Sequence, residues 1–253
     1  MSDIKPQVYK DPRSPEMFQP FHDWTRAHPP GWTYELVRMI LTPIAILLYR
    51  ERAIGTPNVP ADGAFILAPN HFSQMDHFFA GVYIRRKIQF MAKSQMYGNP
   101  VLDYIYRVGG VFPVRRGHHD EEAFKTAYAV LGRGGCVGMY CEGGRSRTGR
   151  LGKAKPGVGR LALESGAPVV PVAIHGSLGV RGWKRLQFPK VTVQFDEPIT
   201  FPRAVSPTHA QQLEASEQIF DRVKAMYAVL EAGGRKAAGA RFALPPGREH
   251  ASG

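Results

Sequence analysis

Cysteine is scarce in this sequence, which has two cysteines among 253 residues. A domain held together by disulfides is therefore excluded. Cys136 and Cys141 lie five positions apart on one predicted strand, so their side chains point to opposite faces of the sheet and we expect them not to pair. These features indicate a protein of the reducing cytoplasm.

Long hydrophobic runs are also lacking. The most apolar stretch, residues 36–49, has 14 residues and is interrupted by Arg38 and Pro43, whereas a helix that spans a membrane needs about 20. Aromatic residues precede the stretch and arginines follow it, which is typical of a helix that lies at a membrane interface or dips into it. A core helix packed on the domain is the alternative. We interpret residues 31–54 as an amphipathic, membrane-associating helix.

Acidic residues are few, with 21 Asp and Glu against 33 Lys and Arg, and the formal net charge is +12. Such a surface attracts nucleic acid, phosphorylated metabolites or an anionic membrane surface. The sequence has no aromatic stacking platform and no known nucleic-acid-binding module, so no specific nucleic acid is expected as a partner. Phosphorylated molecules and a membrane surface remain.

Short apolar runs alternate with helical patterns over most of the chain. Strands are predicted over 64–69, 88–92, 108–114, 134–141, 168–174 and 190–196, and helices over 74–87, 98–107, 119–132, 156–166 and 208–231. This alternation predicts the α/β class, with a single domain over 55–231 whose mixed, largely parallel sheet is covered by helices. The first 30 residues contain six prolines and predict a mobile amino terminus, and residues 232–253 predict a flexible basic tail.

A histidine and an aspartate follow the strand over 64–69 directly, in the sequence Asn70-His71-Phe72-Ser73-Gln74-Met75-Asp76. The carboxyl end of such a strand is where ligands bind in open α/β sheets. On a regular helix His71 and Asp76 would point about 140° apart, so they meet only if His71 lies in a loop and Asp76 in the first helical turn. The carboxylate would then hold one imidazole nitrogen and leave the other to act as a general base near neutral pH.

A basic, glycine-rich segment, EGGRSRTGR over 142–150, follows another predicted strand. Glycine amides beside arginine side chains suit a phosphate, although a flexible basic loop is the alternative. Two further strand ends read GVFPVRRG over 110–117 and VVPVA over 169–173. The sequence has neither a Walker loop nor a G-x-S-x-G elbow, and no cluster of metal ligands, so no metal is expected.

In this order the four segments resemble the phospholipid-type acyltransferase family, whose best-known members are the lysophosphatidate acyltransferases. The family carries N-H-x-x-x-x-D, G-x-x-F-x-x-R, E-G-x-R-S and a V-P block, and the resemblance covers roughly residues 35–200. It implies a glycerolipid acyltransferase-like fold and transfer of a fatty acyl group from acyl-CoA or acyl carrier protein to the free hydroxyl of 1-acylglycerol-3-phosphate, giving phosphatidate. The two donors are substrates, and no other cofactor is implied. The expected location is the cytoplasmic face of an anionic membrane, as a peripheral or monotopic protein.

The resemblance also implies a role for each matching residue. His71 would deprotonate the acceptor hydroxyl, which attacks the thioester directly, and Asp76 would orient His71. The acceptor's glycerophosphate end would be bound by Lys93, Arg115, Glu142, Gly143, Arg145 and Ser146. The acyl chain would occupy a hydrophobic tunnel.

Three departures from the family pattern concern the acceptor. Cys141 replaces the common proline of F-P-E-G, Gly144 replaces a frequent threonine, and Pro113-Val114 replaces Ile-Asp. Glycerol 3-phosphate, a lysophospholipid or a glycolipid therefore remain alternative acceptors, and a non-catalytic lipid-binding protein is the alternative of another class. The length of the acyl chain, the donor and the oligomeric state stay open.

Overall fold

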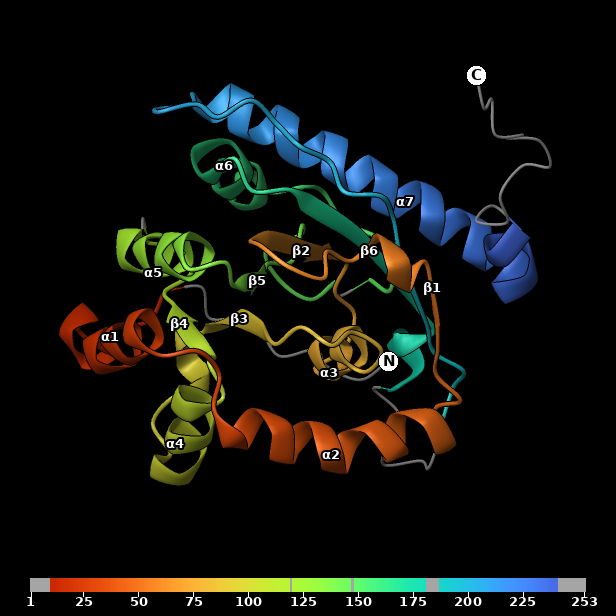
Figure 1. Ribbon diagram of the computed structural model, residues 1–253, viewed down its shortest axis with the longest axis horizontal. Helices are drawn as coiled ribbons and strands as arrows, with labels where there is room; N and C mark the ends of the chain where they lie inside the picture. The colour runs from red at the N-terminus through yellow and green to blue at the C-terminus, as the bar shows by residue number, and fades with distance from the viewer. Residues whose placement is uncertain (1–9, 119, 147, 181–186, 241–253) are drawn as a thin grey trace, which may run out of the picture.

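A seven-stranded sheet forms the centre of the computed structural model, with the strand order β1-β7-β6-β2-β5-β3-β4 (Figure 1). The strands are β1 (Arg52–Ile54), β2 (Phe65–Pro69), β3 (Ile88–Lys93), β4 (Phe112–Val114), β5 (Cys136–Gly138), β6 (Val169–His175) and β7 (Thr192–Phe195). Neighbouring strands are parallel except β6 and β7, which are antiparallel. The structure describes residues 10–118, 120–146, 148–180 and 187–240. The predicted α/β class, with one mixed and largely parallel sheet, is confirmed.

The central strands are apolar because helices cover both faces of the sheet. Every residue of β2 is buried, and in β6 only His175 is partly exposed. Strand β5 lies between β2 and β3 and ends in Gly138, where a Cβ atom would lie 2.4 Å from the Phe90 ring of β3. Glycine at this position therefore lets the aromatic ring pack over the neighbouring strand.

Two helical layers enclose the sheet (Figure 1). One face packs against α5 (Glu121–Gly132), α6 (Pro156–Ser165) and α7 (His209–Ala240), and the other against α2 (Trp32–Leu47) and α3 (Asp76–Gly81), with α4 (Pro100–Val108) beside α2. Cys136 lies in the hydrophobic core under α2 and α3, and Cys141 lies in the core under α5 to α7. Both are free thiols, so the prediction that they do not pair is confirmed.

The amino-terminal segment packs along the β4 edge of the sheet. It forms the 3-10 turn η1 (Pro15–Phe18) and the helix α1 (Gln19–Ala27), each with proline in its first turn, where the fixed φ of proline favours a helix start. Arg13 donates hydrogen bonds to the backbone oxygens of Tyr97 and Ser94, at 2.7 and 2.6 Å. The prediction of a mobile segment over 1–30 is therefore wrong for residues 10–27, and residues 1–9 lie outside the described part of the chain.

The carboxyl-terminal helix extends further than its glycines suggested. Gly234 has a φ of 60° and a ψ of −159° and kinks α7, but helical structure resumes and reaches Ala240. Arg235, just after the kink, donates hydrogen bonds to Thr192 Oγ1 at 2.8 Å and to the backbone oxygen of Val191 at 2.7 Å, which ties this part of the helix to β7. The prediction of a flexible tail over 232–253 is therefore wrong for 232–240, and residues 241–253 lie outside the described chain.

Several predicted elements are shorter in the structure. The helix predicted over 74–87 is reduced to α3. The chain between β2 and β3 must also form the loop after β2 and the return to β3, so only part of it is helical. The strands predicted over 108–114 and 134–141 are reduced to β4 and β5, since Gly110 turns with a φ of 81° after α4 and the chain leaves the sheet after Gly138. The prediction of one helix over 31–54 is wrong for 48–54, where α2 has ended and β1 joins the sheet edge. Among the described helices, none combines the length and the apolar character needed to cross a membrane.

Candidate active site

The candidate site lies at one edge of the sheet, where four neighbouring parallel strands end together. The strands β2, β5, β3 and β4 are adjacent in this order, so the residues that follow them meet at a common edge. These residues are His71 after β2, Tyr140 and Arg145 after β5, Lys93 at the end of β3 and Arg116 after β4. All five side chains line one cavity.

His71 and Asp76 form a hydrogen-bonded pair. His71 lies in the loop after β2, and Asp76 is the first residue of α3. Asp76 Oδ2 accepts a hydrogen bond from His71 Nδ1 at 2.9 Å, and bonds from the backbone amides of Phe72 and Ser73 at 2.7 Å each. The predicted placement of the pair is therefore confirmed. Because Nδ1 donates to the carboxylate, the lone pair of Nε2 is available to a ligand.

The backbone of His71 is held on both sides by the loop after β5. Its amide donates to Glu142 Oε2 at 2.9 Å, and its carbonyl oxygen accepts from the Ser146 amide at 2.8 Å. The imidazole stacks on the Tyr140 ring, with ring centroids 3.7 Å apart and an interplanar angle of 14°. His71 is thus fixed in position before any ligand binds, which favours proton transfer at a defined distance.

The surroundings of His71 keep its imidazole neutral. Burial lowers the pKa of His71, the hydrogen bond to Asp76 opposes this shift, and the nearby charges of Arg116 and Arg145 lower the pKa further. A lowered pKa means that the neutral form prevails at pH 7. Neutral imidazole is the form that accepts a proton.

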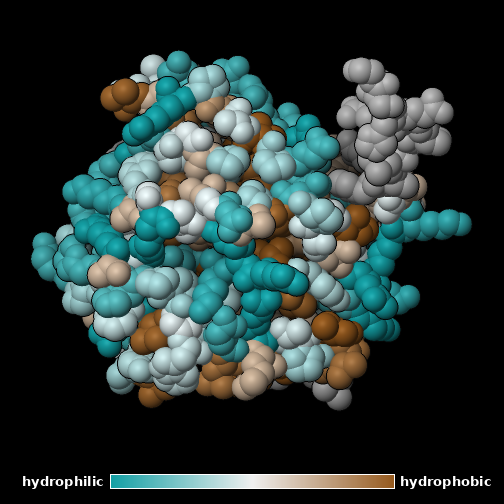
Figure 2. All heavy atoms as spheres, in the orientation of Figure 1, coloured by the Kyte–Doolittle hydropathy of each residue, from teal (hydrophilic) through white to brown (hydrophobic). Residues whose placement is uncertain are grey.

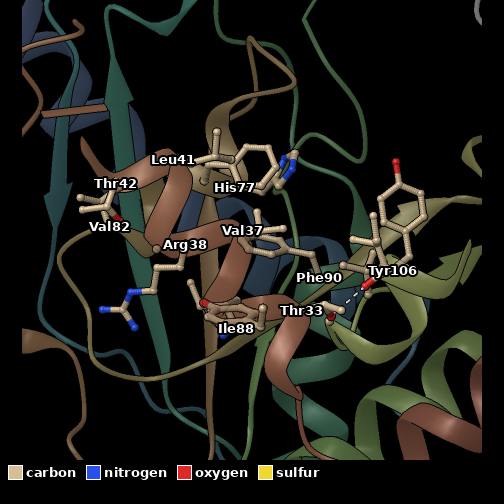
Figure 3. A pocket seen from close by; sticks show the side chains of 16 residues that line it. Thr33, Val37, Arg38, Leu41, Thr42, His77, Val82, Ile88, Phe90 and Tyr106 are labelled. Atoms are coloured by element: carbon tan, nitrogen blue, oxygen red, sulfur yellow. Dashed lines mark hydrogen bonds between the residues drawn. The ribbon is translucent and has the colours of Figure 1, made fainter. Parts of the chain in front are cut away.

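Two cavities meet beside this histidine. The first is the cavity just described, which we call the polar cavity because Lys93, Arg116 and Arg145 line it. The second is apolar and lies between α2, α3, α4 and β3 (Figure 3). The residues that line both cavities, and so mark their junction, are His77, Phe90, Tyr106 and Val111.

The polar cavity is suited to a phosphate group. Lys93, Arg116 and Arg145 all line it, and the pKa of Lys93 is lowered by burial and by the charges of the two arginines. Three cations in one cavity repel one another, and an anion between them relieves the repulsion. Among the described residues, no group of three or more His, Cys, Asp and Glu could hold a metal ion.

The structure does not bring Arg115 into this cavity. Its guanidinium donates to the backbone oxygen of Arg13 at 2.9 Å, and so ties down the amino-terminal segment. Its neighbour Arg116 lines the cavity instead. The two neighbouring side chains therefore leave the backbone after β4 in different directions. The G-x-x-F-x-x-R pattern counted from Gly109 falls on Phe112 and Arg115, so the sequence pattern selects the arginine that does not face the cavity.

Three other predicted site residues lie in the loop after β5 and shape it. Glu142 accepts hydrogen bonds from the backbone amides of His71, at 2.9 Å, and Gly152, at 2.7 Å. Each of its two carboxylate oxygens therefore accepts one backbone amide. Burial raises the pKa of Glu142, and these two amides oppose the shift. Gly143 has a φ of 64°, which the sharp turn requires. Ser146 Oγ donates to the backbone oxygen of Arg150 at 2.5 Å. The structure places these residues around His71 as supports of its loop.

Sequence reasoning did not select three residues of the site: Arg116, Tyr140 and His77. Arg116 stands directly beside the arginine that the G-x-x-F-x-x-R pattern selects, and that adjacency is a signal that could have found it. Tyr140 and His77 carry no such signal, because their position depends on how the loop after β5 and the helix α3 fold against each other.

A neutral histidine lies between a cationic cavity and an apolar one on an open α/β sheet, an arrangement suited to an amphiphilic anion. The model of the family described as Acyltransferase matches residues 52–175. A Bacillus subtilis protein named 1-acyl-sn-glycerol-3-phosphate acyltransferase is 32% identical over 144 residues, which is 56% of this chain and 71% of the relative. The chain belongs to the acyltransferase family.

Other relatives share the name of that protein. A chloroplastic 1-acyl-sn-glycerol-3-phosphate acyltransferase of Brassica napus is 28% identical over 132 residues, 51% of this chain. The alignments span 38% of that relative's length and 37% of its Arabidopsis thaliana counterpart's length. The 1-acyl-sn-glycerophosphate acyltransferase PlsC from Thermotoga maritima, whose crystal structure is known, is 22% identical in sequence, and its structure matches with a TM-score of 0.60 over 85% of this chain and 89% of that one. This likeness shows a shared fold.

Proposed function

We propose that this protein is a 1-acyl-sn-glycerol-3-phosphate acyltransferase, which moves a fatty acyl group from a thioester to the free hydroxyl of 1-acylglycerol-3-phosphate and forms phosphatidate. The observation that carries the proposal is the position of His71, beside Lys93, Arg116 and Arg145 in one cavity and next to the junction with an apolar cavity. A lysophosphatidate has a phosphate for the first cavity and an acyl thioester has a chain for the second. The names of the relatives support the same substrates.

The proposed reaction begins with the acceptor hydroxyl. His71 Nε2 accepts its proton while the oxygen attacks the thioester carbonyl carbon, and Asp76 stabilises the imidazolium that forms. The carbon–sulfur bond then breaks, and the imidazolium returns the proton to the departing thiolate. The products are phosphatidate and a free thiol, and no covalent acyl-enzyme is formed.

The acyl donor in this proposal is acyl-CoA or acyl carrier protein, and no further cofactor takes part. Both donors present the acyl group on phosphopantetheine, and the net charge of +12 favours either anionic molecule. Glycerol 3-phosphate, a lysophospholipid and a glycolipid are the alternative acceptors for the same chemistry.

Release of thiol from palmitoyl-CoA, with and without lysophosphatidate, tests the proposal, and two adjacent arginines sharpen the test. Arg116→Ala is expected to raise the acceptor KM by about 10–100-fold, because a charge-assisted hydrogen bond to the phosphate is lost. Arg115→Ala also removes one positive charge. The Arg115 side chain, however, donates its hydrogen bond to the backbone oxygen of Arg13 and does not face the cavity, so we expect an unchanged acceptor KM and a lower Tm.

Several outcomes of this experiment would contradict the proposal. Equal effects of the two variants on the acceptor KM would refute the phosphate site. Equal rates with acceptors that lack a phosphate would point to a glycolipid or another acceptor. Thiol release without an acceptor would indicate a thioesterase, and no release with any donor or acceptor would leave a lipid-binding role.

We also propose that the outer face of α2 and the neighbouring surface of α4 bind the membrane. The inner face of α2 lines the apolar cavity, whereas its outer side chains include Met39, which is 68% exposed, and Leu47, which is 73% exposed. Val101 of α4 is 67% exposed. Figure 2 shows hydrophobic side chains along the lower border of the molecule, where Figure 1 places these helices. Amphiphilic substrates would reach the cavity directly from a bilayer at this surface, which suits peripheral or monotopic attachment to the cytoplasmic face.

Two charges on the outer face of α2 should weaken this attachment. The double variant Met39→Glu, Ile40→Glu is expected to lower binding to anionic vesicles at least about tenfold, because burial of two large apolar side chains is lost. Val205→Glu is the control, since Val205 is 95% exposed but lies away from both helices. Flotation with liposomes measures binding, and unchanged flotation of the double variant would show that α2 serves only as a cavity wall.

A further inference from the structure

The junction of the two cavities has two polar side chains, those of His77 and Tyr106, that the proposed reaction has not used. Acyl transfer at His71 requires the thioester carbon to lie beside that histidine in the polar cavity while its chain lies in the apolar cavity. The thioester carbonyl oxygen must therefore lie at the junction, which is lined by His77, Phe90, Tyr106 and Val111. This argument rests on the proposed function.

Only His77 and Tyr106 among these four residues have side chains that can donate a hydrogen bond. Tyr106 belongs to α4, and its ring packs against Tyr97 with centroids 5.5 Å apart. Burial and, to a smaller extent, the charge of Asp103 raise the pKa of Tyr106. His77 follows Asp76 directly in α3, and its imidazole is close enough to His71 for the two rings to interact electrostatically. His77 is therefore the donor on the side of the junction where the chemistry takes place.

The imidazole of His77 stands in an apolar wall. It packs against Phe78 with ring centroids 4.0 Å apart and against Phe90 at 5.9 Å. Figure 3 shows it among the side chains around the apolar cavity, together with Val37 and Leu41 of α2. Within the described part of the chain, no group forms a hydrogen bond with this imidazole, whereas the polar side chains Thr33 and Arg38 of the same cavity are bonded to backbone oxygens. The imidazole of His77 is therefore able to form a hydrogen bond with a ligand at the junction.

The ring of His77 is neutral over the whole physiological range. Burial and the neighbouring His71 lower the pKa of His77 to about 4, and the charge of Asp76 only partly opposes them. A neutral imidazole has one N–H and one lone pair. It can donate a hydrogen bond without placing a second positive charge beside the imidazolium that forms on His71.

We propose that the N–H of His77 donates a hydrogen bond to the thioester carbonyl oxygen of the acyl donor, and that this bond strengthens as the oxygen becomes an oxyanion. When the acceptor oxygen attacks, the carbonyl electron pair moves onto this oxygen. It returns when the carbon–sulfur bond breaks and the thiolate leaves. His77 keeps its proton throughout, so His71 alone moves a proton and His77 stabilises charge. In this assignment His77 is a catalytic residue.

Kinetics of two variants test the assignment with palmitoyl-CoA and lysophosphatidate as substrates. His77→Leu keeps a side chain of similar size in the cavity wall but removes the hydrogen-bond donor. We expect kcat to fall about 10²–10³-fold, with both KM values within about threefold of wild type. The reason is that a donor to the oxyanion acts mainly in the transition state. His77→Gln retains an N–H and should recover at least about tenfold of that loss. Equal activity of the leucine variant and wild type, or a loss confined to KM or to the preferred chain length, would overturn the assignment and leave His77 as a wall residue.

A spectroscopic measurement covers the case in which the leucine variant is poorly folded or inactive for another reason. In a His71→Ala background the donor stays intact, and the infrared band of palmitoyl-CoA labelled with ¹³C at the carbonyl reports the hydrogen bond. We expect a lower stretching frequency when His77 is present than when it is replaced by glutamine or leucine, with the leucine variant highest. The same frequency in all three proteins would refute the bond. Wild type without acyl transfer to any acceptor would instead refute the proposed function itself.

Discussion

Replacing His71 with alanine is expected to lower acceptor-dependent release of thiol by about 10²–10⁴-fold, the usual contribution of a general base. The reason is that a hydroxyl attacks a thioester slowly unless a base accepts its proton, and His71 Nε2 is the proposed base, next to the junction of the two cavities. The fold should survive, because among the described residues the imidazole hydrogen-bonds to Asp76 alone and the loop is held by backbone bonds to Glu142 and Ser146. Initial rates with palmitoyl-CoA and lysophosphatidate measure the effect.

An exposed histidine provides the control for this substitution. His209→Ala, at the start of α7, should keep wild-type activity. The general-base assignment is refuted by full turnover in His71→Ala, and also by a similar loss in both variants.

The pH profile should identify the same residue. Because the pKa of His71 is lowered by burial and by the nearby arginines, the neutral, active form persists below the ordinary histidine value of about 6.5. We therefore expect kcat/KM to rise with pH, with the midpoint of the rise below about 6.5. Arg145→Gln removes one of the positive charges and should move this rise to higher pH. A rise centred above the ordinary value would contradict the assignment.

The second large effect is expected on stability, at the contact between α6 and α7. Gly159 of α6 lies so close to α7 that a Cβ atom would be 2.0 Å from the backbone oxygen of Gln212 and 2.7 Å from Ser216 Oγ. Its amide also donates to Ser216 Oγ at 2.8 Å. Gly159→Ala must therefore push the two helices apart. We expect a loss of about 3 kcal/mol or more in the free energy of unfolding, which corresponds to a Tm lower by roughly 6–12 °C.

The same helix offers a matched control for this loss. Gly157, two residues earlier, would place its Cβ 3.5 Å from Met139 Sδ, an ordinary contact distance. Gly157→Ala should leave the Tm unchanged or raise it, because alanine has the better helix propensity. Thermal unfolding of both variants by circular dichroism is the measurement. A similar Tm for the two would mean that α6 and α7 can separate at little cost.

The elements that local pattern specifies were predicted well. Continuous apolar runs predicted β2, β3 and β6 at nearly their observed positions. A strand that helices cover on both faces needs apolar side chains at almost every position, and such a run is easy to recognise in a sequence. The His71–Asp76 pair could be predicted too, since a five-residue spacing after a strand allows contact only across a loop and a first helical turn. Tertiary contacts decided the rest. Strand β1 has three residues, too few for a recognisable pattern, and it becomes a strand by pairing with β7.

The amino-terminal and carboxyl-terminal segments show why composition misled. Proline-rich and glycine-containing sequences favour mobility when they have no partner. Here Arg13 bonds to the backbone of Ser94 and Tyr97, and Arg235 bonds to β7. Both partners lie far away in the sequence, so no local pattern could reveal them.

The sequence by itself determined the central strands of the sheet, the loop that carries His71, and the set of basic residues proposed to bind a phosphate, because each depends on the order and spacing of neighbouring residues. Only the tertiary structure decided which cation faces the cavity. Arg115 and Arg116 are chemically identical neighbours, and the backbone direction after β4 sends one to the amino-terminal segment and the other to the site. The tertiary structure also decided that Glu142 accepts a hydrogen bond from the backbone amide of His71, and that His77 lies at the junction of the two cavities. Both positions depend on separate strands that end at the same edge of the sheet.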